Sequence, residues 1–371
     1  MTVSIIIKTL NEEKNIARTI EHALAALAAL PGGNGAIAGE VILADSGSRD
    51  RTVEIASCYP VRIVQIEAPA RPSCGIGPQL GFQYARNAFV CLIDGDMDLD
   101  PEFLPDALAW LDANAKAAGV TGHVEEMMLG NLEYTRRVQR NAPENRTGAI
   151  DRMNGGGLYR KSAIEKVGYL TDRNLHGYEE FDLGIRLRHS GFDLFRMDRR
   201  FVRHYGHNVN SYKLLLRRWK TKYLFGIGEV LRAATGKPYF GQMLKELPEL
   251  KLWALVWAWI LVSMGLIAFS PSHLAGLGVV ILLFVAIVAL MSQRKGSFSL
   301  GLYTVVAWLF HAAALPVGYC ATRRDPKAWV ESRPVGGQNE RSQQSGPEAG
   351  MEDGPSGRAG AVGSSPRSLI G

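Results

Sequence analysis

Two aspartates separated by one glycine, Asp94-Gly95-Asp96, directly follow an apolar stretch of the chain. Carboxylates at positions i and i+2 of a turn can converge on one hard cation, and oxygen ligands of this kind suit Mg²⁺ or Mn²⁺. Such ions usually hold substrate phosphates as well. A further carboxylate, Asp45, follows another short apolar stretch. The pattern predicts a divalent-metal site for a phosphate-bearing substrate.

The alternation of apolar and amphipathic stretches predicts the elements that position these carboxylates. Strands are expected at 3–7, 41–44, 61–66 and 89–93, and helices at 12–30, 50–57, 77–87 and 102–118. Asn11 is expected to cap the first helix, and Pro101 to start the fourth. This order implies α/β architecture with a parallel sheet, in which ligands bind beyond the carboxyl ends of the strands. The rule selects three polar loops: Thr9–Glu13, Asp45–Arg51 and Asp94–Asp100.

Several other classes of protein are excluded by composition and motif. The chain has 371 residues, a formal net charge of +6 and 47% hydrophobic residues, which excludes global disorder. The loop after the first strand, KTLNEE, lacks the glycines of a dinucleotide-binding fold, and no phosphate-binding P-loop occurs. The four cysteines are widely spaced, which excludes a cysteine zinc site and a disulfide scaffold.

Five segments, taken together and in order, resemble the family 2 glycosyltransferases of GT-A fold. They are SIIIKTLNEEKNIARTI, VILADSGSRDRT, CLIDGDMDLDP, MNGGGLYRKSAIEKVGYL and HGYEEFDLGIRLRHSGF. The resemblance runs from about residue 2 to residue 225. It implies a Rossmann-like GT-A domain, the fold of nucleotide-diphospho-sugar transferases, and a glycosyltransferase activity.

The resemblance implies a role for each matching residue on the donor side. Asp45 would bind the nucleobase or ribose of the nucleotide sugar, with help from Thr9, Asn11 and Glu12. Asp94 would contact the ribose or the metal shell. The backbone of Gly155 and Gly156 would approach the donor sugar closely, although a plain flexible turn would also explain these glycines.

The resemblance also implies the ligands of the metal ion, which would be Mg²⁺ or Mn²⁺. Asp96 would ligate the ion that bridges the diphosphate of the donor. His204 occupies the position of a further metal ligand in some members of the family, and His207 competes for the same role. A structural histidine is the alternative for either residue.

Glu180 occupies the position of the catalytic base, which in the family is an aspartate. The glutamate is longer by one methylene than an aspartate. Its neighbour Glu179 is a rival for the role, and Asp182 is a further candidate. Arg186 lies four residues after Asp182, so a helical ion pair between them is the expected role of Arg186.

The chemistry that these groups support is direct displacement at the anomeric carbon. A cation stabilises the charge that develops on the leaving diphosphate, and a carboxylate deprotonates the acceptor hydroxyl. No carboxylate nucleophile is required, so the configuration inverts. We therefore predict an inverting enzyme that moves a sugar from a nucleotide-diphosphate sugar to a hydroxyl of a lipid-linked glycan, as in bacterial exopolysaccharide or cell-envelope assembly. The alternatives are a polyprenyl-phosphate sugar transferase, which needs no base, a non-catalytic membrane scaffold and a transporter.

Three uncharged runs in the last third of the chain predict membrane-spanning helices at 253–269, 274–291 and 298–320. Lys and Arg are concentrated before the first run and between the second and third, so these parts are expected in the cytoplasm. Three crossings would place the C-terminus outside, whereas Arg323, Arg324 and Lys327 favour the inside. Either one of the apolar runs enters the membrane and returns without crossing it, or the charges before the first run determine the orientation.

The predicted organisation is a catalytic domain at 1–235, a linker at 236–252, three transmembrane helices and a disordered tail at 331–371. The end of the domain, 209–235, contains the basic segment YKLLLRRWKTK, which is expected to lie on an anionic membrane surface, with a solvated basic helix as the alternative. No nucleic-acid-reading motif accompanies it, so nucleic acid is not expected as a partner. These features predict a multi-pass protein of the cytoplasmic (inner) membrane with its catalytic domain in the cytoplasm.

Overall fold

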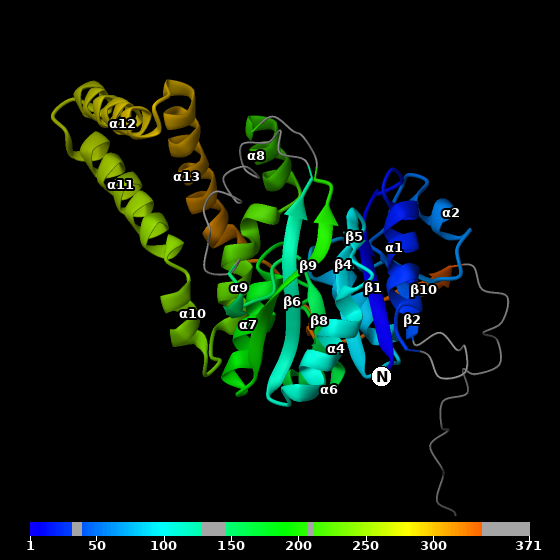
Figure 1. Ribbon diagram of the computed structural model, residues 1–371. Coiled ribbons are helices and arrows are strands. Elements are labelled where there is room, and N and C mark those ends of the chain that lie inside the picture. Colours follow the sequence, from blue (N-terminus) through cyan, green and yellow to red (C-terminus); the bar gives the residue numbers. More distant parts are fainter. Residues whose placement is uncertain (32–38, 128–145, 207–210, 336–371) are drawn as a thin grey trace, which may run out of the picture. The chain divides into compact units, whose positions relative to one another are not determined.

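Four parallel strands form one half of the sheet in the computed structural model, which describes residues 1–31, 39–127, 146–206 and 211–335. The strands are β1 (Val3–Thr9), β2 (Gly39–Asp45), β3 (Arg62–Ile66) and β4 (Phe89–Asp94), and their order is β3-β2-β1-β4. They coincide with the four predicted strands, and Figure 1 labels β1, β2 and β4 of this group. The parallel α/β sheet expected from the sequence is confirmed for this half.

The other half of the sheet is mixed. It contains β5 (Met97–Leu99), β6 (Ala117–Glu126), β7 (Gly148–Ala149), β8 (Gly157–Arg160) and β9 (Asp193–His204). The order continues β4-β8-β6-β9-β5; β8 is antiparallel to β4 and β6, whereas β6 and β9 are parallel. The antiparallel pairing with β8 brings the glycine-rich segment before it to the end of β4.

Helices separate most of the strands along the chain as far as β9, and among the described residues four further helical segments, α8 to α10, follow β9. Their bounds are α1 (Ile16–Ala28), α2 (Thr52–Ala56), α3 (Ile76–Tyr84), α4 (Phe103–Ala113), α6 (Lys161–Val167), α7 (Glu179–His189), α8 (Ser211–Lys220), η3 (Tyr223–Phe225), α9 (Gly226–Ala234) and α10 (Phe240–Glu246). The predicted linker 236–252 therefore contains a helix, α10, together with the start of α11.

Two sequence predictions about helix ends were wrong. The helix predicted at 102–118 ends at Ala113, because the residues from Ala117 onwards join the sheet as β6. Asn11 does not cap α1, which begins at Ile16; Asn11 instead lies in the preceding loop with a φ of 61°. Strand pairing in the sheet ends the helix at Ala113, and hydrogen bonds to the loop after β2 hold Asn11. Local helix propensity reports on neither kind of long-range contact.

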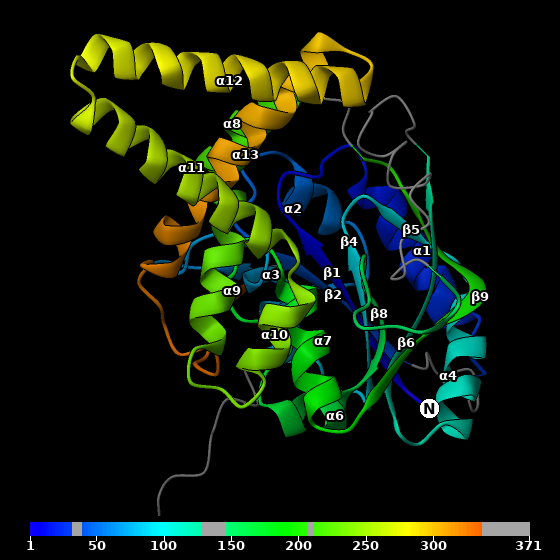
Figure 2. The ribbon, with the colours of Figure 1, turned by 90° about the vertical axis from the view of Figure 1, so that its left-hand side faces the viewer.

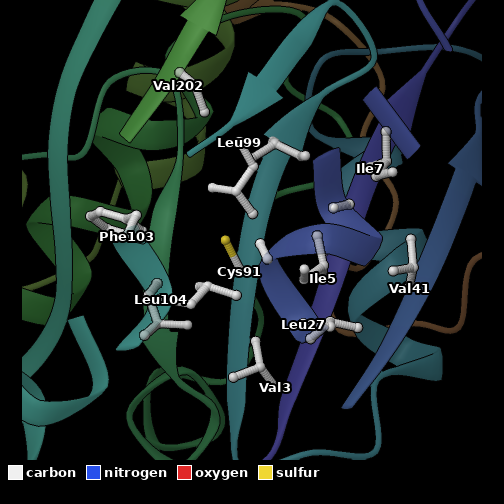
Figure 3. Packing of buried hydrophobic residues seen from close by; sticks show 14 of the residues in the cluster. Val3, Ile5, Ile7, Leu27, Val41, Cys91, Leu99, Phe103, Leu104 and Val202 are labelled. Carbon is white, nitrogen blue, oxygen red and sulfur yellow. The ribbon is translucent and has the colours of Figure 1, made fainter. Parts of the chain in front are cut away.

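The core explains why β1 reads as a continuous apolar run. Val3, Ile5 and Ile7 face one layer of the core, where Figure 3 shows them near Cys91 and Leu27. Ile6 points to the opposite face and packs in the second layer. Successive side chains of a strand alternate between faces, so a strand covered on both sides is apolar at most positions. The buried Ser4 is an exception, and its hydroxyl donates a hydrogen bond to Glu40 at 2.8 Å. The sheet is thus a rigid platform whose carboxyl edge carries the polar loops.

Three long apolar helices follow α10: α11 (Glu249–Phe269), α12 (His273–Lys295) and α13 (Phe298–Tyr319). Each is long and apolar enough to span a membrane. They contain the three predicted runs (Figures 1 and 2). The tail predicted as disordered from residue 331 begins instead with β10 (Ser332–Val335), which pairs antiparallel with β3. The rest of that prediction, 336–371, lies outside the described residues.

Candidate active site

The carboxyl ends of β2, β1 and β4 bring together the three loops selected from the sequence. Thr9 at the end of β1 is in register with Asp45 of β2, and Lys8 is in register with Asp94 of β4. Gly95 donates its backbone N–H to the carbonyl of Lys8 at 3.0 Å. The predicted convergence of the loops is therefore present in the structure.

Asp45 is fully buried and holds the loop that follows β2. Its carboxylate accepts hydrogen bonds from the backbone N–H groups of Gly47 and Ser48 at 3.0 Å and from the side chain of Gln65 at 2.7 Å. Thr9 Oγ1 is 3.3 Å from the same carboxylate. Asp45 thus shapes the surface that would meet the nucleoside, and its role in donor binding stays a prediction.

The loop after β1 is tied to the loop after β2 by hydrogen bonds. The Asn11 backbone N–H donates to Ser48 Oγ, and Asn11 Oδ1 accepts from the Arg49 N–H, both at 2.8 Å. The N–H of Glu12 donates to Thr52 Oγ1 at 2.8 Å. Burial raises the pKa of the Glu12 carboxyl to about 7, and nearby Asp96 contributes to the shift. These contacts hold the candidate donor loop as one unit.

Lys8 is a residue of the site that the sequence analysis missed. Its ammonium lies 2.9 Å from Asp94 Oδ1 and 3.8 Å from Glu179 Oε1. Burial alone would lower the pKa of Lys8, but the negative charges of Glu179 and Glu180 outweigh burial and raise it. A lysine within an otherwise apolar strand, next to the polar loop, was the signal available in the sequence. The ammonium of Lys8 thus lies between Asp94, at the candidate metal site, and Glu179, one of the two candidate bases.

Asp96 and His204 lie next to each other, as the family resemblance implied. Asp96 Oδ2 is 3.3 Å from His204 Nε2, and Glu126 Oε2 is 2.6 Å from the other ring nitrogen, Nδ1. β9 ends at His204 and pairs with β6, which ends at Glu126. Burial alone would lower the pKa of His204, but the hydrogen bonds to Asp96 and Glu126 raise it to about 9. Glu126 was not among the residues identified from the sequence, and His207 lies outside the described residues.

These side chains fit a divalent cation that is completed by a substrate. Within the described ranges, no group of three or more His, Cys, Asp or Glu side chains is arranged to hold a metal ion. Mg²⁺ is usually held by one or two carboxylates together with substrate phosphates and water, so a full protein cage is not required. Glu126 on the Nδ1 of His204 is the arrangement by which proteins orient a ligating histidine. Asp94 Oδ1, in contrast, is already paired with the ammonium of Lys8 at 2.9 Å.

Glu179 and Glu180 begin α7 but have different environments. Glu179 is 8% exposed and faces Lys8; burial raises the pKa of its carboxyl, and the charge of Lys8 opposes that shift. Glu180 is half-buried, and its Oε1 accepts a hydrogen bond from the Gly155 N–H at 3.0 Å. Glu180 is therefore the more accessible of the two candidate bases.

The glycines before β8 are required by backbone geometry. Gly155, Gly156 and Gly157 have φ values of 80°, 93° and 152°. A Cβ on Gly156 would lie 2.0 Å from the carbonyl oxygen of Leu92, in β4. The flexible-turn alternative is thus replaced by a tightly packed segment that carries the N–H donor to Glu180.

We expect the substitution Gly156→Ala to destabilise the protein by at least about 1–3 kcal/mol, because it adds both a backbone strain and a clash with Leu92. Gly241→Ala is the matched control, since Gly241 lies in α10 and a Cβ there meets no atom within 4 Å. Alanine is favoured over glycine in helices, so the control is expected to be neutral or slightly stabilising. Thermal unfolding of the purified variants in detergent measures both effects. Equal melting temperatures would contradict this account.

Asp182 and Arg186 form the ion pair expected from their spacing. Arg186 Nε lies 2.8 Å from Asp182 Oδ2, and both residues are buried. The same guanidinium donates to the backbone carbonyls of Tyr169 and Leu170. The ion pair thus fixes α7 to the segment before it through Arg186, and Asp182 has no exposed surface from which to reach an acceptor.

We expect Asp182→Asn to destabilise the protein by about 3–5 kcal/mol, since it leaves the buried Arg186 charge uncompensated. Glu54→Gln, which breaks the exposed pair between Arg51 and Glu54, is the control and should cost about 1 kcal/mol or less. Denaturant unfolding of the two variants tests the difference. A small effect of Asp182→Asn on stability together with a large loss of activity would instead indicate a catalytic role.

Comparison with known proteins decides the family of this region. Residues 4–168 match the family described as "Glycosyl transferase family 2". This region is a family 2 glycosyltransferase domain. The match includes the strands β1–β4, the Asp94-Gly95-Asp96 turn and the glycine segment, so the resemblance is confirmed for this part of the chain. The segment that contains Glu179 and Glu180 lies beyond the match.

Two curated proteins are similar to parts of the chain. The low-salt glycan biosynthesis hexosyltransferase Agl6 of Haloferax volcanii is 36% identical over 107 residues, which cover 29% of this chain and 24% of that protein. The dodecaprenyl-phosphate galacturonate synthase of Rhizobium johnstonii is 27% identical over 118 residues, which cover 30% of this chain and 33% of that protein. The matches thus span about a quarter and a third of the lengths of these relatives.

A solved structure extends the similarity of the fold beyond the family 2 domain. The mannosyltransferase PcManGT of Pyrobaculum calidifontis, in complex with GDP-Man and Mn²⁺, has a TM-score of 0.54 with 17% sequence identity, and the alignment covers 85% of this chain and 86% of that one. At this identity the comparison concerns the fold alone. The expected GT-A fold followed by apolar helices is confirmed.

Proposed function

We propose that the protein is an inverting glycosyltransferase that transfers a sugar from a nucleotide-diphosphate sugar to a hydroxyl of a lipid-linked glycan. The observation that carries the proposal is the set of groups that α7 and β9 bring to the carboxyl edge of β1 and β4, the edge that belongs to the family 2 region. A carboxylate and an imidazole, Asp96 and His204, lie 3.3 Å apart, and Glu180 lies within hydrogen-bond distance of the glycine segment beside β4. These groups suit a metal-bridged diphosphate and a general base.

On the donor side, Asp96 and His204 would hold Mg²⁺ or Mn²⁺, with Asp94 in or next to the metal shell and Glu126 orienting the imidazole. Bound there, a divalent ion supplies positive charge to the leaving diphosphate. Thr9, Asn11, Glu12 and the Asp45-shaped loop would surround the nucleoside. The structure of PcManGT with GDP-Man and Mn²⁺ supports this combination of donor and ion.

On the acceptor side, Glu180 would accept the proton of the attacking hydroxyl. The hydrogen bond from Gly155 fixes its carboxylate, while its partial exposure leaves it reachable for an acceptor. General-base catalysis by a positioned carboxylate contributes about 10²–10⁴-fold. Glu179 would serve to hold Lys8 near Asp94, so that positive charge remains between the two carboxylate groups.

A polyprenyl-phosphate sugar transferase is the second candidate. It is favoured by the similarity to the galacturonate synthase, whose name gives a dodecaprenyl-phosphate product. A phosphate acceptor is already ionised and needs no base. The two candidates therefore differ in their dependence on Glu180.

The setting that we propose is the cytoplasmic face of the inner membrane, with the apolar helices as anchor and with exopolysaccharide or cell-envelope glycan assembly as the pathway class. Three helices that could span a membrane support the anchor. Lys and Arg near their ends support the cytoplasmic orientation.

The test is nucleoside-diphosphate release by membranes that contain the full chain, with a panel of UDP-, GDP- and dTDP-sugars and a lipid extract as acceptor. We expect release from one donor, stimulated by Mn²⁺ or Mg²⁺ and abolished by EDTA. Analysis of the lipid product by mass spectrometry distinguishes a glycosylated hydroxyl from a polyprenyl-phosphate sugar. If no donor were bound and no nucleoside diphosphate were released from any donor, a catalytic role would be contradicted. That result would favour the non-catalytic membrane scaffold.

A further inference from the structure

The chain enters the apolar helices directly from the catalytic unit, by which we mean residues 1–246 of the described ranges. In α10, Met243 is fully buried in a cluster that includes Phe181 of α7, the helix that begins with the two candidate bases. Tyr178 Oη, next to the candidate bases, donates a hydrogen bond to the carboxylate of Glu249 at 2.9 Å. Because Glu249 is the first residue of α11, the start of this helix is fixed beside the catalytic unit.

The chain also returns to the catalytic unit when α13 ends. Asn174 Nδ2 donates to the carbonyl of Arg324 at 2.9 Å, and Gln83 exchanges two hydrogen bonds with the backbone of the buried Val330. Arg323 pairs with the buried Asp172. The segment then adds β10 to the edge of the sheet at β3. The exit from α13 is therefore on the same side of the membrane as the entry into α11.

A chain that leaves and rejoins a domain on one side of a membrane crosses that membrane an even number of times. Three consecutive crossings, which the apolar runs alone predict, are incompatible with the contacts at both ends. At least one of the three helices therefore does not cross the membrane.

The helix α13 lies along the catalytic unit for most of its length. The ring centroids of Tyr303 and Tyr212 are 5.1 Å apart, and those of Phe310 and Trp219 are 5.6 Å apart. A Cβ on Gly318 would lie 2.1 Å from the Phe225 carbonyl oxygen, so the end of α13 touches η3 directly. Tyr303 to Gly318 corresponds to about 22 Å of helix at 1.5 Å per residue. This contact surface runs along most of α13, while Val305 and Ala312 of the same helix pack in clusters with side chains of α12 and α11. If α13 crossed the membrane, the side chains of the catalytic unit that contact it would have to enter the hydrocarbon core.

The partner of α13 on this surface, α8, is strongly basic. Leu215 and Trp219 face α13, whereas Lys213, Arg217 and Lys220 are exposed on the other side of α8. Each such charge is costly in hydrocarbon, about 3 kcal/mol or more at the centre of a bilayer. A basic amphipathic helix is stable at a surface of anionic headgroups. Since α8 and α13 are packed together, both belong at the membrane surface.

The helices α11 and α12 have the properties of a crossing hairpin. They contain 21 and 23 residues, about 31 and 34 Å, which matches the ~30 Å hydrocarbon core. Phe269 and Leu274, on either side of their uncharged connector, are 91% and 81% exposed. A Cβ on Gly276 would lie 2.5 Å from the Leu266 carbonyl oxygen, so the two helices pack closely at the tip. At its other end, α12 finishes with Arg294 and Lys295. These charges remain on the side of the membrane that holds the catalytic unit, which we call the catalytic side.

We propose that only α11 and α12 cross the membrane, and that α13 and α8 together form an interfacial surface on the catalytic side, where the basic face of α8 meets anionic lipid headgroups. The N-terminal strand β1 and the strand β10 after α13 then lie on the same side of the membrane as the catalytic unit. The surface positions the active site at a fixed distance from the headgroups, independently of which acceptor is used.

Protease sites inserted into the full chain test the number of crossings. The sites are placed before Met1, after Pro271, after Gly296 and after Gly371, and sealed vesicles of both orientations are digested. We expect the site after Pro271 to be cut only from the side opposite to the N-terminal site, and the other two only from the same side as the N-terminal site. Cleavage of the last site from the opposite side would overturn the proposal, as would cleavage after Pro271 from the catalytic side.

Cross-linking in intact membranes tests the surface formed by α8 and α13. The variant Tyr212→Cys/Tyr303→Cys is made with Cys58→Ser and Cys320→Ser, which removes the two exposed cysteines. Burial raises the pKa of the remaining thiols, Cys74 and Cys91, so they react slowly.

A short bismaleimide is expected to join positions 212 and 303, as detected by mass spectrometry. The pair Tyr212→Cys/Phe269→Cys, at the hairpin tip, is the control and should give no product. Absence of the first cross-link, although each cysteine is labelled singly, would overturn the contact between the helices.

Discussion

Glu180→Gln is expected to lower sugar transfer to a hydroxyl acceptor by about 10²–10⁴-fold while leaving donor binding unchanged. The glutamine preserves the size of the side chain and its hydrogen bond from Gly155, which is 3.0 Å long in the native protein. Only the ability to accept the proton of the acceptor is removed. The effect should therefore be on kcat, with little change in the dissociation constant of the nucleotide sugar.

Glu179→Gln is the matched comparison, since it makes the same chemical change one residue earlier. Glu179 is buried against Lys8, so we expect a smaller loss of rate together with a loss of stability. Glu180→Asp is expected to recover part of the activity, because a carboxylate is retained with a shorter reach. Initial rates of nucleoside-diphosphate release and calorimetric donor titrations measure all three variants.

The results of this series separate the candidate functions. A large loss for Glu179→Gln with full activity for Glu180→Gln would assign the base to Glu179. Full activity of both variants would favour a phosphate acceptor, as the similarity to the dodecaprenyl-phosphate galacturonate synthase suggests. Loss of donor binding in either variant would show that the residue acts on the donor instead.

Asp96→Asn is expected to abolish the response to Mn²⁺ or Mg²⁺ and to reduce the transfer rate by on the order of 10³-fold, because the charge on the leaving diphosphate loses several kcal/mol of stabilisation. Asp96 is the carboxylate beside His204, and an asparagine keeps its shape but not its charge. Donor binding is measured by calorimetry with and without EDTA. We expect EDTA to weaken binding to the native protein and to have little effect on the variant.

Asp98→Asn is a control two residues further along the chain. Asp98 is buried and paired with Arg18 at 2.7 Å, so its replacement should lower stability but leave the metal response intact. Glu126→Gln is expected to weaken metal affinity by about 10–100-fold, because Glu126 orients the imidazole of His204. If Asp96→Asn kept a normal metal response, the metal site would have to be placed elsewhere.

The candidate site could be predicted from the sequence where residues follow strands directly. Asp45 and Asp94 end apolar runs, and parallel strands place their carboxyl ends at one edge of a sheet, so the proximity of these loops followed from topology. The pair Asp182–Arg186 was likewise predictable, because residues four apart on a helix are neighbours. In both cases a local spacing determines the contact.

Residues whose role depends on distant partners were not predictable in this way. Lys8 faces Glu179 across 171 positions of sequence, and Glu126 meets His204 only because β6 pairs with β9. Asn11 resembles a helix cap in the sequence, but its side chain is used by the loop after β2. A one-dimensional pattern contains no information on which long-range partner competes for a side chain.

The membrane region shows most clearly which properties follow from local sequence and which depend on contacts between distant segments. The amino-acid sequence by itself determined that three helices are apolar enough for a bilayer, because hydropathy is a property of composition over about 20 residues. It also determined the family 2 domain, whose motifs are local. Only the tertiary structure decided that the chain rejoins the sheet at β10 after α13, and that α13 packs on α8. Crossing number depends on where both ends of a helical region are held, and this depends on contacts between segments far apart in the sequence.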